Sequence, residues 1–145
     1  MKFLGIDHGN ARIGVAVSDP TGSLARPLRI LKHVSRAEDA AAVAKVAHYE
    51  ICQAIVVGLP LDADGSQGPR ARSVNRFIEE LQKQTGLTII AWDESHSTQH
   101  ALQASISRGE GKKKRQEPMD DQAAAIILQD YLDNHCPQAE NEVKP

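Results

Sequence analysis

Residues 3–19 read FLGIDHGNARIGVAVSD, two short apolar runs separated by residues 8–11. Both runs are rich in branched side chains, and Gly9 and Asn10 tolerate the positive φ angles of a tight turn. The pattern predicts a β-hairpin whose first strand ends near Asp7. A carboxylate at a buried strand end needs a hydrogen bond, an ion pair or a metal ion. Asp7 is therefore a candidate functional residue, and the competing interpretation is a turn acid bonded to the amides of Gly9 and Asn10.

The composition fits one domain without a membrane segment. A chain of 145 residues buries roughly two thirds of its unfolded surface, enough for one core. Cys52 and Cys136 are far apart and lack metal-type spacing, so we expect free thiols. With no apolar run near ~20 residues and no signal-peptide pattern, we expect a cytoplasmic protein that does not bind membranes. The formal net charge of −2 means that nucleic-acid binding must depend on a local basic patch.

Apolar patterns after the hairpin predict alternating strands and helices. The predicted strands cover residues 26–34, 54–59 and 88–92, and the predicted helices cover residues 40–51, 69–86, 97–108 and a final segment that begins at residue 120. Three antiparallel strands followed by strand and helix alternation indicate an α/β fold with a mixed five-stranded sheet flanked by helices. We expect one domain over residues 1–136 and a polar C-terminal tail over residues 137–145.

Acidic residues occur at three predicted element ends. Asp7 ends the first strand, Asp93 and Glu94 follow the last strand, and Asp120 and Asp121 open the final helix. Strand ends in such sheets border one crevice, so these acids could converge there. Clustered carboxylates repel each other, so convergence implies Mg²⁺ or Mn²⁺. Alternatively, the acids after the strand interact with a helix dipole, and Asp120 is an N-cap.

Two segments have the composition of phosphate-binding sites. Residues 59–70 connect a buried strand to a helix whose first turn contains Arg70 and Arg72. This arrangement suits either an anion site or a polar connection. The basic run at residues 112–115 could bind a phosphodiester backbone, although such runs are often simply solvated. His96 and His100 lack a third ligand, which favours surface residues over a zinc site.

Short motifs then occur in order along the chain: GID with RIGVA at residues 5–16, VGLP with DG at residues 57–65, WDE at residues 92–94, and Asp120 followed by AA and IL at residues 123–128. Together they resemble the YqgF/RuvX family. The resemblance implies an RNase H-like fold and a magnesium-dependent nuclease that processes pre-16S rRNA or resolves Holliday junctions. It makes Asp7, Glu94 and Asp120 the catalytic and metal-binding acids. The arginine that usually follows the Asp-Glu pair in this family is replaced by Ser95.

The sequence thus predicts a metal-dependent endonuclease acting on RNA or branched DNA, with Asp7 bridging two cations. A two-fold junction substrate would call for a homodimer. The predicted nucleic-acid contacts are basic: Arg12, Arg70, Arg72, Lys112, Lys113, Lys114 and Arg115. The alternative is a nucleic-acid-binding module of the same fold with weak catalysis. An ATPase of the sugar-kinase type shares the opening hairpin but needs a second domain, for which this chain is too short.

Overall fold

The computed structural model describes residues 1–94 and 120–143. The described elements, in chain order, are β1 (Phe3–His8), β2 (Arg12–Ser18), β3 (Ala25–Lys32), α1 (Arg36–Tyr49), β4 (Ala54–Leu59), α2 (Pro69–Gln84), β5 (Thr88–Asp93) and α5 (Asp120–Val143). The helix predicted over residues 97–108 lies outside the described residues. No helix within the described ranges combines the length and the apolarity needed to cross a bilayer.

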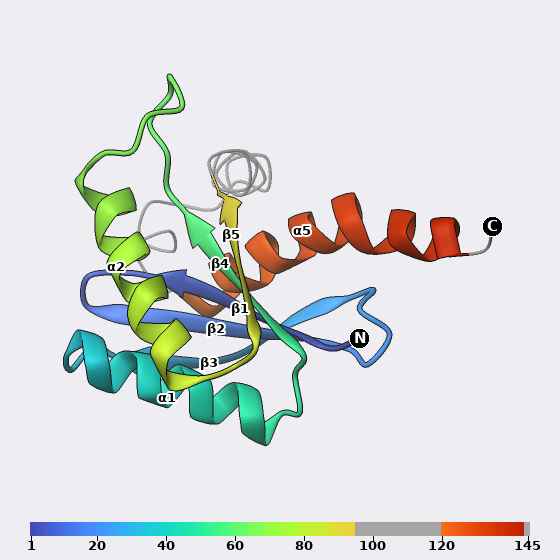
Figure 1. Ribbon diagram of the computed structural model, residues 1–145, viewed down its shortest axis with the longest axis horizontal. Helices are drawn as coiled ribbons and strands as arrows, with labels where there is room; N and C mark the ends of the chain where they lie inside the picture. The colour runs from blue at the N-terminus through green and yellow to red at the C-terminus, as the bar shows by residue number, and fades with distance from the viewer. Residues whose placement is uncertain (95–119, 144–145) are drawn as a thin grey trace, which may run out of the picture.

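The strands form one sheet in the order β3-β2-β1-β4-β5 (Figure 1). β1 and β2 form the predicted hairpin, and β3 continues it as an antiparallel meander. β4 and β5 add to β1 as parallel strands, which places the ends of β1, β4 and β5 at one edge of the sheet. The prediction of a mixed five-stranded sheet is confirmed.

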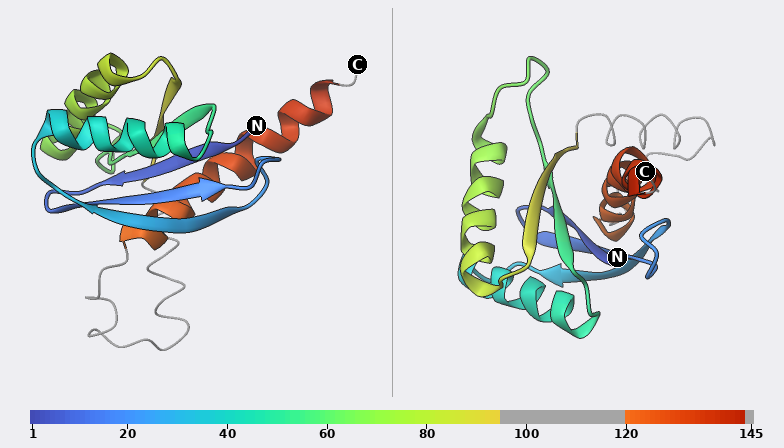
Figure 2. Two further views of the ribbon diagram at one scale, coloured as in Figure 1. Left: turned by 90° about the horizontal axis from the view of Figure 1, so that it is seen from below. Right: turned by 45° about the vertical axis from the view of Figure 1, so that its right-hand side comes forward.

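Side chains alternate between the two faces of the sheet and form two cores. Leu4 and Ile6 of β1 pack in one core with α1 and α2. Phe3 and Val56 pack in the other core with α5. Figure 2 shows α1 and α2 on one side of the sheet and α5 on the other. We refer to these sides as the α1/α2 face and the α5 face.

The direction of α5 is fixed by close contacts with β1. A Cβ at Gly5 would lie 2.7 Å from Leu128 Cβ and 3.1 Å from the Ala124 carbonyl oxygen, so glycine allows the helix to approach the strand. Earlier on β1, the Phe3 ring meets Tyr131 at 5.6 Å between centroids. Increasing residue numbers on α5 therefore match decreasing numbers on β1. The beginning of α5 lies toward the carboxyl end of β1.

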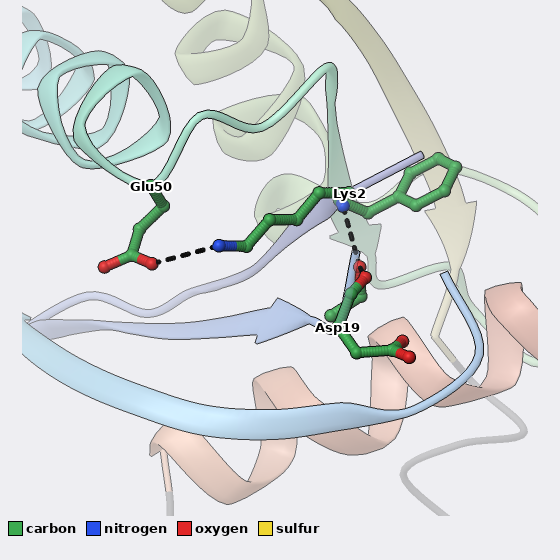
Figure 3. Close-up of polar contacts among 5 residues, drawn as sticks. Lys2, Asp19 and Glu50 are labelled. Carbon is green, nitrogen blue, oxygen red and sulfur yellow. Dashed lines mark hydrogen bonds and ion pairs between the residues drawn. The ribbon is translucent and has the colours of Figure 1, made fainter. Parts of the chain in front are cut away.

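Two polar contacts connect the sheet to the helices that cover it. Trp92 Nε1 donates to Asp130 Oδ2 at 2.8 Å, which ties β5 to α5. At the opposite end of the molecule from the β1–β2 turn, Lys2 Nζ lies 3.5 Å from Glu50 Oε1 at the end of α1 (Figure 3). Cys52 is buried and free, and burial raises the pKa of its thiol to about 11, which makes it a poor nucleophile.

The final helix extends further than the sequence pattern indicated. The prediction placed a polar tail from residue 137, whereas α5 continues to Val143. This polar segment is rich in residue types with good helix propensity, namely Gln138, Ala139, Glu140 and Glu142. Their propensity explains why the helix continues beyond the apolar stripe.

Candidate active site

Glu94 follows β5 directly and lies at the sheet edge where β1 and β4 also end. Its backbone N–H donates to the Leu59 carbonyl oxygen at 3.1 Å, one residue beyond the last β4–β5 pair, Leu59 with Asp93. This bond continues the parallel ladder and orients Glu94 as the next residue of the strand. By alternation along β5, Glu94 shares the α5 face with Trp92.

Gly58 leaves the space that the Glu94 side chain occupies. A Cβ at position 58 would overlap Glu94 Oε1 and would lie 2.7 Å from Ile127 Cδ1. An isolated glycine inside a buried strand often marks such a close approach. Gly58 therefore belongs to the site as the residue that lets the Glu94 carboxylate approach the backbone near the carboxyl end of β4.

The Glu94 carboxyl group is buried, and among the described residues the charge of Arg70 offsets only part of the cost. Its residue exposure is only 7%. Among the described residues, Oε1 has no hydrogen-bond partner. Burial, followed by the negative charge of Asp7, raises the pKa of Glu94 to about 7, with a smaller opposing effect from Arg70 and a further raising effect from Asp93. Such a group is expensive to keep ionised unless a cation approaches it.

Asp7 supplies the neighbouring negative charge from β1. It is half-buried and pairs with Gly14 across the hairpin. Alternation from Phe3 and Gly5 places Asp7 on the α5 face, the same face as Glu94. The Gly9 N–H donates to the Arg12 carbonyl oxygen at 2.9 Å, so one of the two amides required by the turn-acid interpretation is already used by the hairpin.

The third predicted acid begins α5. Asp120 is the first residue of that helix, one turn before Ala124, which packs over Gly5 of β1. The Asp120 and Asp121 side chains lie outside the described part of the structure. Within the described part, the side chains form no group of three or more possible metal ligands. The metal set Asp7, Glu94 and Asp120 therefore remains a prediction.

Basic residues approach the site from two directions. Arg70, in the first turn of α2, is close enough to lower the pKa of Glu94 and also to affect His8. On the other side, Arg12 of β2 pairs with Lys32 of β3. Arg12 precedes Gly14, the partner of Asp7, by two positions on β2, and Lys32 lies directly across from Arg12. Both therefore share the α5 face with Asp7.

The loop between β4 and α2 satisfies its own backbone groups. Asp62 N–H donates to the Ser66 carbonyl oxygen at 2.9 Å, and Gly65 N–H donates to the Asp62 carbonyl oxygen at 2.8 Å. Arg72 Nη1 donates to the Gln67 carbonyl oxygen at 3.1 Å. These contacts favour the interpretation of the loop as a polar connection.

The sequence interpretation missed two parts of this site. Gly58 was visible as an interrupted apolar strand, but the side chain that fills its space comes from another strand. Lys32 was visible only as the end of a strand, because its pairing with Arg12 depends on a register that includes a shift beside Val15. The predicted residues Lys112 to Arg115, and also His96 and His100, lie outside the described residues.

Comparison with known proteins identifies the family of this chain. Residues 1–134 match a family model described as RuvX, Holliday junction resolvase. A Myxococcus xanthus protein named "Putative pre-16S rRNA nuclease" is 39% identical over 137 residues, covering 94% of this chain and 91% of the relative. A protein of the same name from Anaeromyxobacter sp. is 40% identical over 133 residues, covering 92% of this chain and 97% of the relative.

The fold has a counterpart among solved structures. RuvC of T. thermophilus, solved in complex with Holliday junction substrate, superposes with a TM-score of 0.58 at 20% identity, over 91% of this chain and 93% of the other. This likeness confirms the expected RNase H-like fold.

Proposed function

Because this chain belongs to the RuvX family, we propose that it is an endonuclease that hydrolyses phosphodiester bonds in structured nucleic acid at the Asp7–Glu94 site. Its relatives are named as nucleases of pre-16S rRNA, which makes the 5′ region of that precursor the first substrate to test. A branched DNA junction is the second. The proposed place of action is the cytoplasm.

The unpartnered oxygen of Glu94 is the observation that supports this proposal most strongly. Glu94 Oε1 is buried beside the negative charge of Asp7, without a donor among the described residues. Two neighbouring carboxylates with an unused oxygen match the ligands that Mg²⁺ and Mn²⁺ prefer. A divalent cation would favour the ionised form of both groups and remove their mutual repulsion. We therefore propose that Asp7 and Glu94 hold Mg²⁺ or Mn²⁺.

Asp120 is the third proposed ligand. Because α5 runs opposite to β1, moving one turn back from Ala124 leads toward the end of β1 where Asp7 lies. Position 120 also shares a helix stripe with Ala124, which packs against the sheet. The backbone geometry thus supports an approach of Asp120 to the carboxylate pair.

Each group of the site has a proposed task. Bound divalent cations would activate a water molecule and stabilise the leaving oxygen. Asp7 and Glu94 would fix the cation position, and Gly58 would keep Glu94 in place. Arg70, Arg12 and Lys32 would bind substrate phosphates on either side of the carboxylates, which compensates for the missing guanidinium at Ser95.

Cleavage assays test this proposal directly. Purified protein is incubated with labelled RNA of the 5′ region of the 16S rRNA precursor, with single-stranded RNA, an RNA duplex and a four-way DNA junction. Each substrate is tested with and without Mg²⁺ or Mn²⁺. We expect metal-dependent products from the parent protein and at least a hundredfold loss in Glu94→Gln. Glu50→Gln, the same change at the far end of the sheet, should cleave like the parent. Binding without cleavage of any substrate would instead indicate the nucleic-acid-binding module.

A further inference from the structure

A polar cavity lies on the α1/α2 face, beside the turn of the β1–β2 hairpin. It has a volume of about 380 Å³. Side chains from the hairpin, the β3–α1 connection and α2 contribute to its lining, namely His8, Asn10, His33, Ser35, Arg36 and Ser73. The His8 ring packs against Phe77 at 4.5 Å between centroids, which fixes the imidazole on this face. Figure 2 shows the hairpin turn and the beginning of α1 at the same side of the molecule.

The described lining offers hydrogen-bond donors and no carboxylate. The nearby acid, Asp39, is buried and already engaged. Its Oδ2 lies 2.5 Å from His33 Nδ1, and its Oδ1 accepts from the Val34 N–H at 2.9 Å. The cavity is therefore suited to an anion, because its described lining carries the Arg36 guanidinium while the Asp39 carboxylate is already bonded to His33 of the lining and to the Val34 N–H.

Arg36 lies at a position where the helix dipole does not favour a cation, and Glu38 and Asp39 in the same turn offset part of its charge. It is the first residue of α1, after the N-cap Ser35. The amino end of a helix carries partial positive charge, so a cation there is repelled and an anion is attracted. Arg70 occupies the corresponding first turn of α2, which contains no acidic residue. An anion in the cavity, which Arg36 lines, would offset the repulsion between Arg36 and the helix end.

We propose that this cavity binds a backbone phosphate of the nucleic-acid strand that is cleaved at Asp7 and Glu94. His8 directly follows Asp7, and consecutive strand residues point to opposite faces. A strand crossing the carboxyl end of β1 therefore meets the carboxylates on one face and the cavity on the other. The inference rests on the proposed nuclease function and adds a phosphate subsite beside the reaction centre.

Binding measurements on matched variants test the subsite. The probe is a labelled 12-nucleotide oligouridylate, followed by fluorescence anisotropy without divalent cations, so that cleavage is absent. Arg36→Ala should weaken binding about tenfold, as expected for one charge-assisted phosphate contact. It should also reduce the salt slope by about 0.7. Ser73→Asp, which adds a negative charge to the cavity from α2, should weaken binding at least as much.

Lys45→Ala is the matched control. Lys45 is exposed on the same helix as Arg36 and lies outside the cavity lining. Replacing either residue by alanine removes one positive charge, so the two variants have the same net charge. Lys45→Ala should alter affinity less than twofold. The melting temperature of Arg36→Ala should equal or exceed that of the parent, which separates lost binding from lost folding.

Three outcomes would overturn the subsite. Equal affinities for Arg36→Ala and Lys45→Ala would show that the cavity makes no phosphate contact. Unchanged binding by Ser73→Asp would have the same meaning. The third outcome concerns uridine monophosphate. If it binds as tightly as the oligomer, and if Arg36→Ala weakens its binding equally, the cavity binds a free nucleotide. Absence of cleavage by the parent protein would refute the nuclease proposal but leave these binding comparisons interpretable.

Discussion

Replacing Glu94 by glutamine should change the pH dependence of folding stability in a calculable way. Burial and Asp7 raise the pKa of Glu94 from its ordinary value of 4.5 to about 7 in the folded protein. Between these two pH values the unfolded chain has released the proton that the folded protein keeps. The parent protein therefore loses stability as the pH rises from about 4.5 to about 7. Glu94→Gln lacks this titration.

The size of the effect follows from the shift. At 1.36 kcal/mol per pH unit, the buried carboxylate costs the parent about 3 kcal/mol above pH 7. The stability difference between Glu94→Gln and the parent should therefore grow in favour of the variant by up to about 3 kcal/mol between pH 4.5 and pH 8. Effects of the substitution that do not depend on pH cancel in this comparison. So do titrations shared by both proteins, including that of His8, whose pKa is lowered chiefly by burial.

Urea denaturation followed by circular dichroism measures this difference, at several pH values and without divalent cations. Glu50→Gln serves as the control and should run parallel to the parent. Profiles of Glu94→Gln and the parent that stay parallel within about 0.5 kcal/mol would refute a raised pKa at Glu94. The argument that an unpartnered buried carboxylate awaits a cation would then lose its physical basis.

Further substitutions test the other parts of the site. Asp7→Asn should abolish cleavage while folding is preserved, whereas normal cleavage would favour the turn-acid interpretation. It should also lower the pKa of Glu94, so the pH-dependent stability difference that Glu94→Gln produces should become smaller. Gly58→Ala should displace Glu94, reduce cleavage and destabilise the fold by about 1–3 kcal/mol, whereas Gly86→Ala, which meets open space, should do neither. Lys32→Ala should weaken oligonucleotide binding and lower its salt slope by up to about one, measured by anisotropy against Lys45→Ala; an unchanged slope would remove the β2–β3 edge from the substrate path. Replacing Lys112, Lys113, Lys114 and Arg115 by alanine should weaken binding without changing Mg²⁺ affinity in calorimetry; unchanged binding would indicate a solvated loop.

Periodicity in the sequence predicted the sheet because each strand has a characteristic pattern of burial. The register of the β1–β2 hairpin follows from the short turn after His8. The strand β4 was recognisable as a continuous apolar run because both its faces are covered. The final helix was recognisable by the stripe of Ala124, Ile127 and Leu128, all of which are buried. The extension of this helix to Val143 was not recognisable, because polar residues give no periodic pattern of apolar positions.

The active-site geometry required the assembled sheet, since it depends on side chains that approach across strands. The sequence pattern placed Asp7 and Glu94 at strand ends, but it left open that Glu94 is an acid of a first helical turn, stabilised by the helix dipole. What distinguishes the two interpretations is the missing side chain at Gly58, which allows the Glu94 carboxylate to be buried against β4. A surface acid near a helix would have been solvated and would have kept an ordinary pKa. Burial next to Asp7 instead produces a repulsive pair, and such a pair is stable at neutral pH only when a cation or a proton joins it.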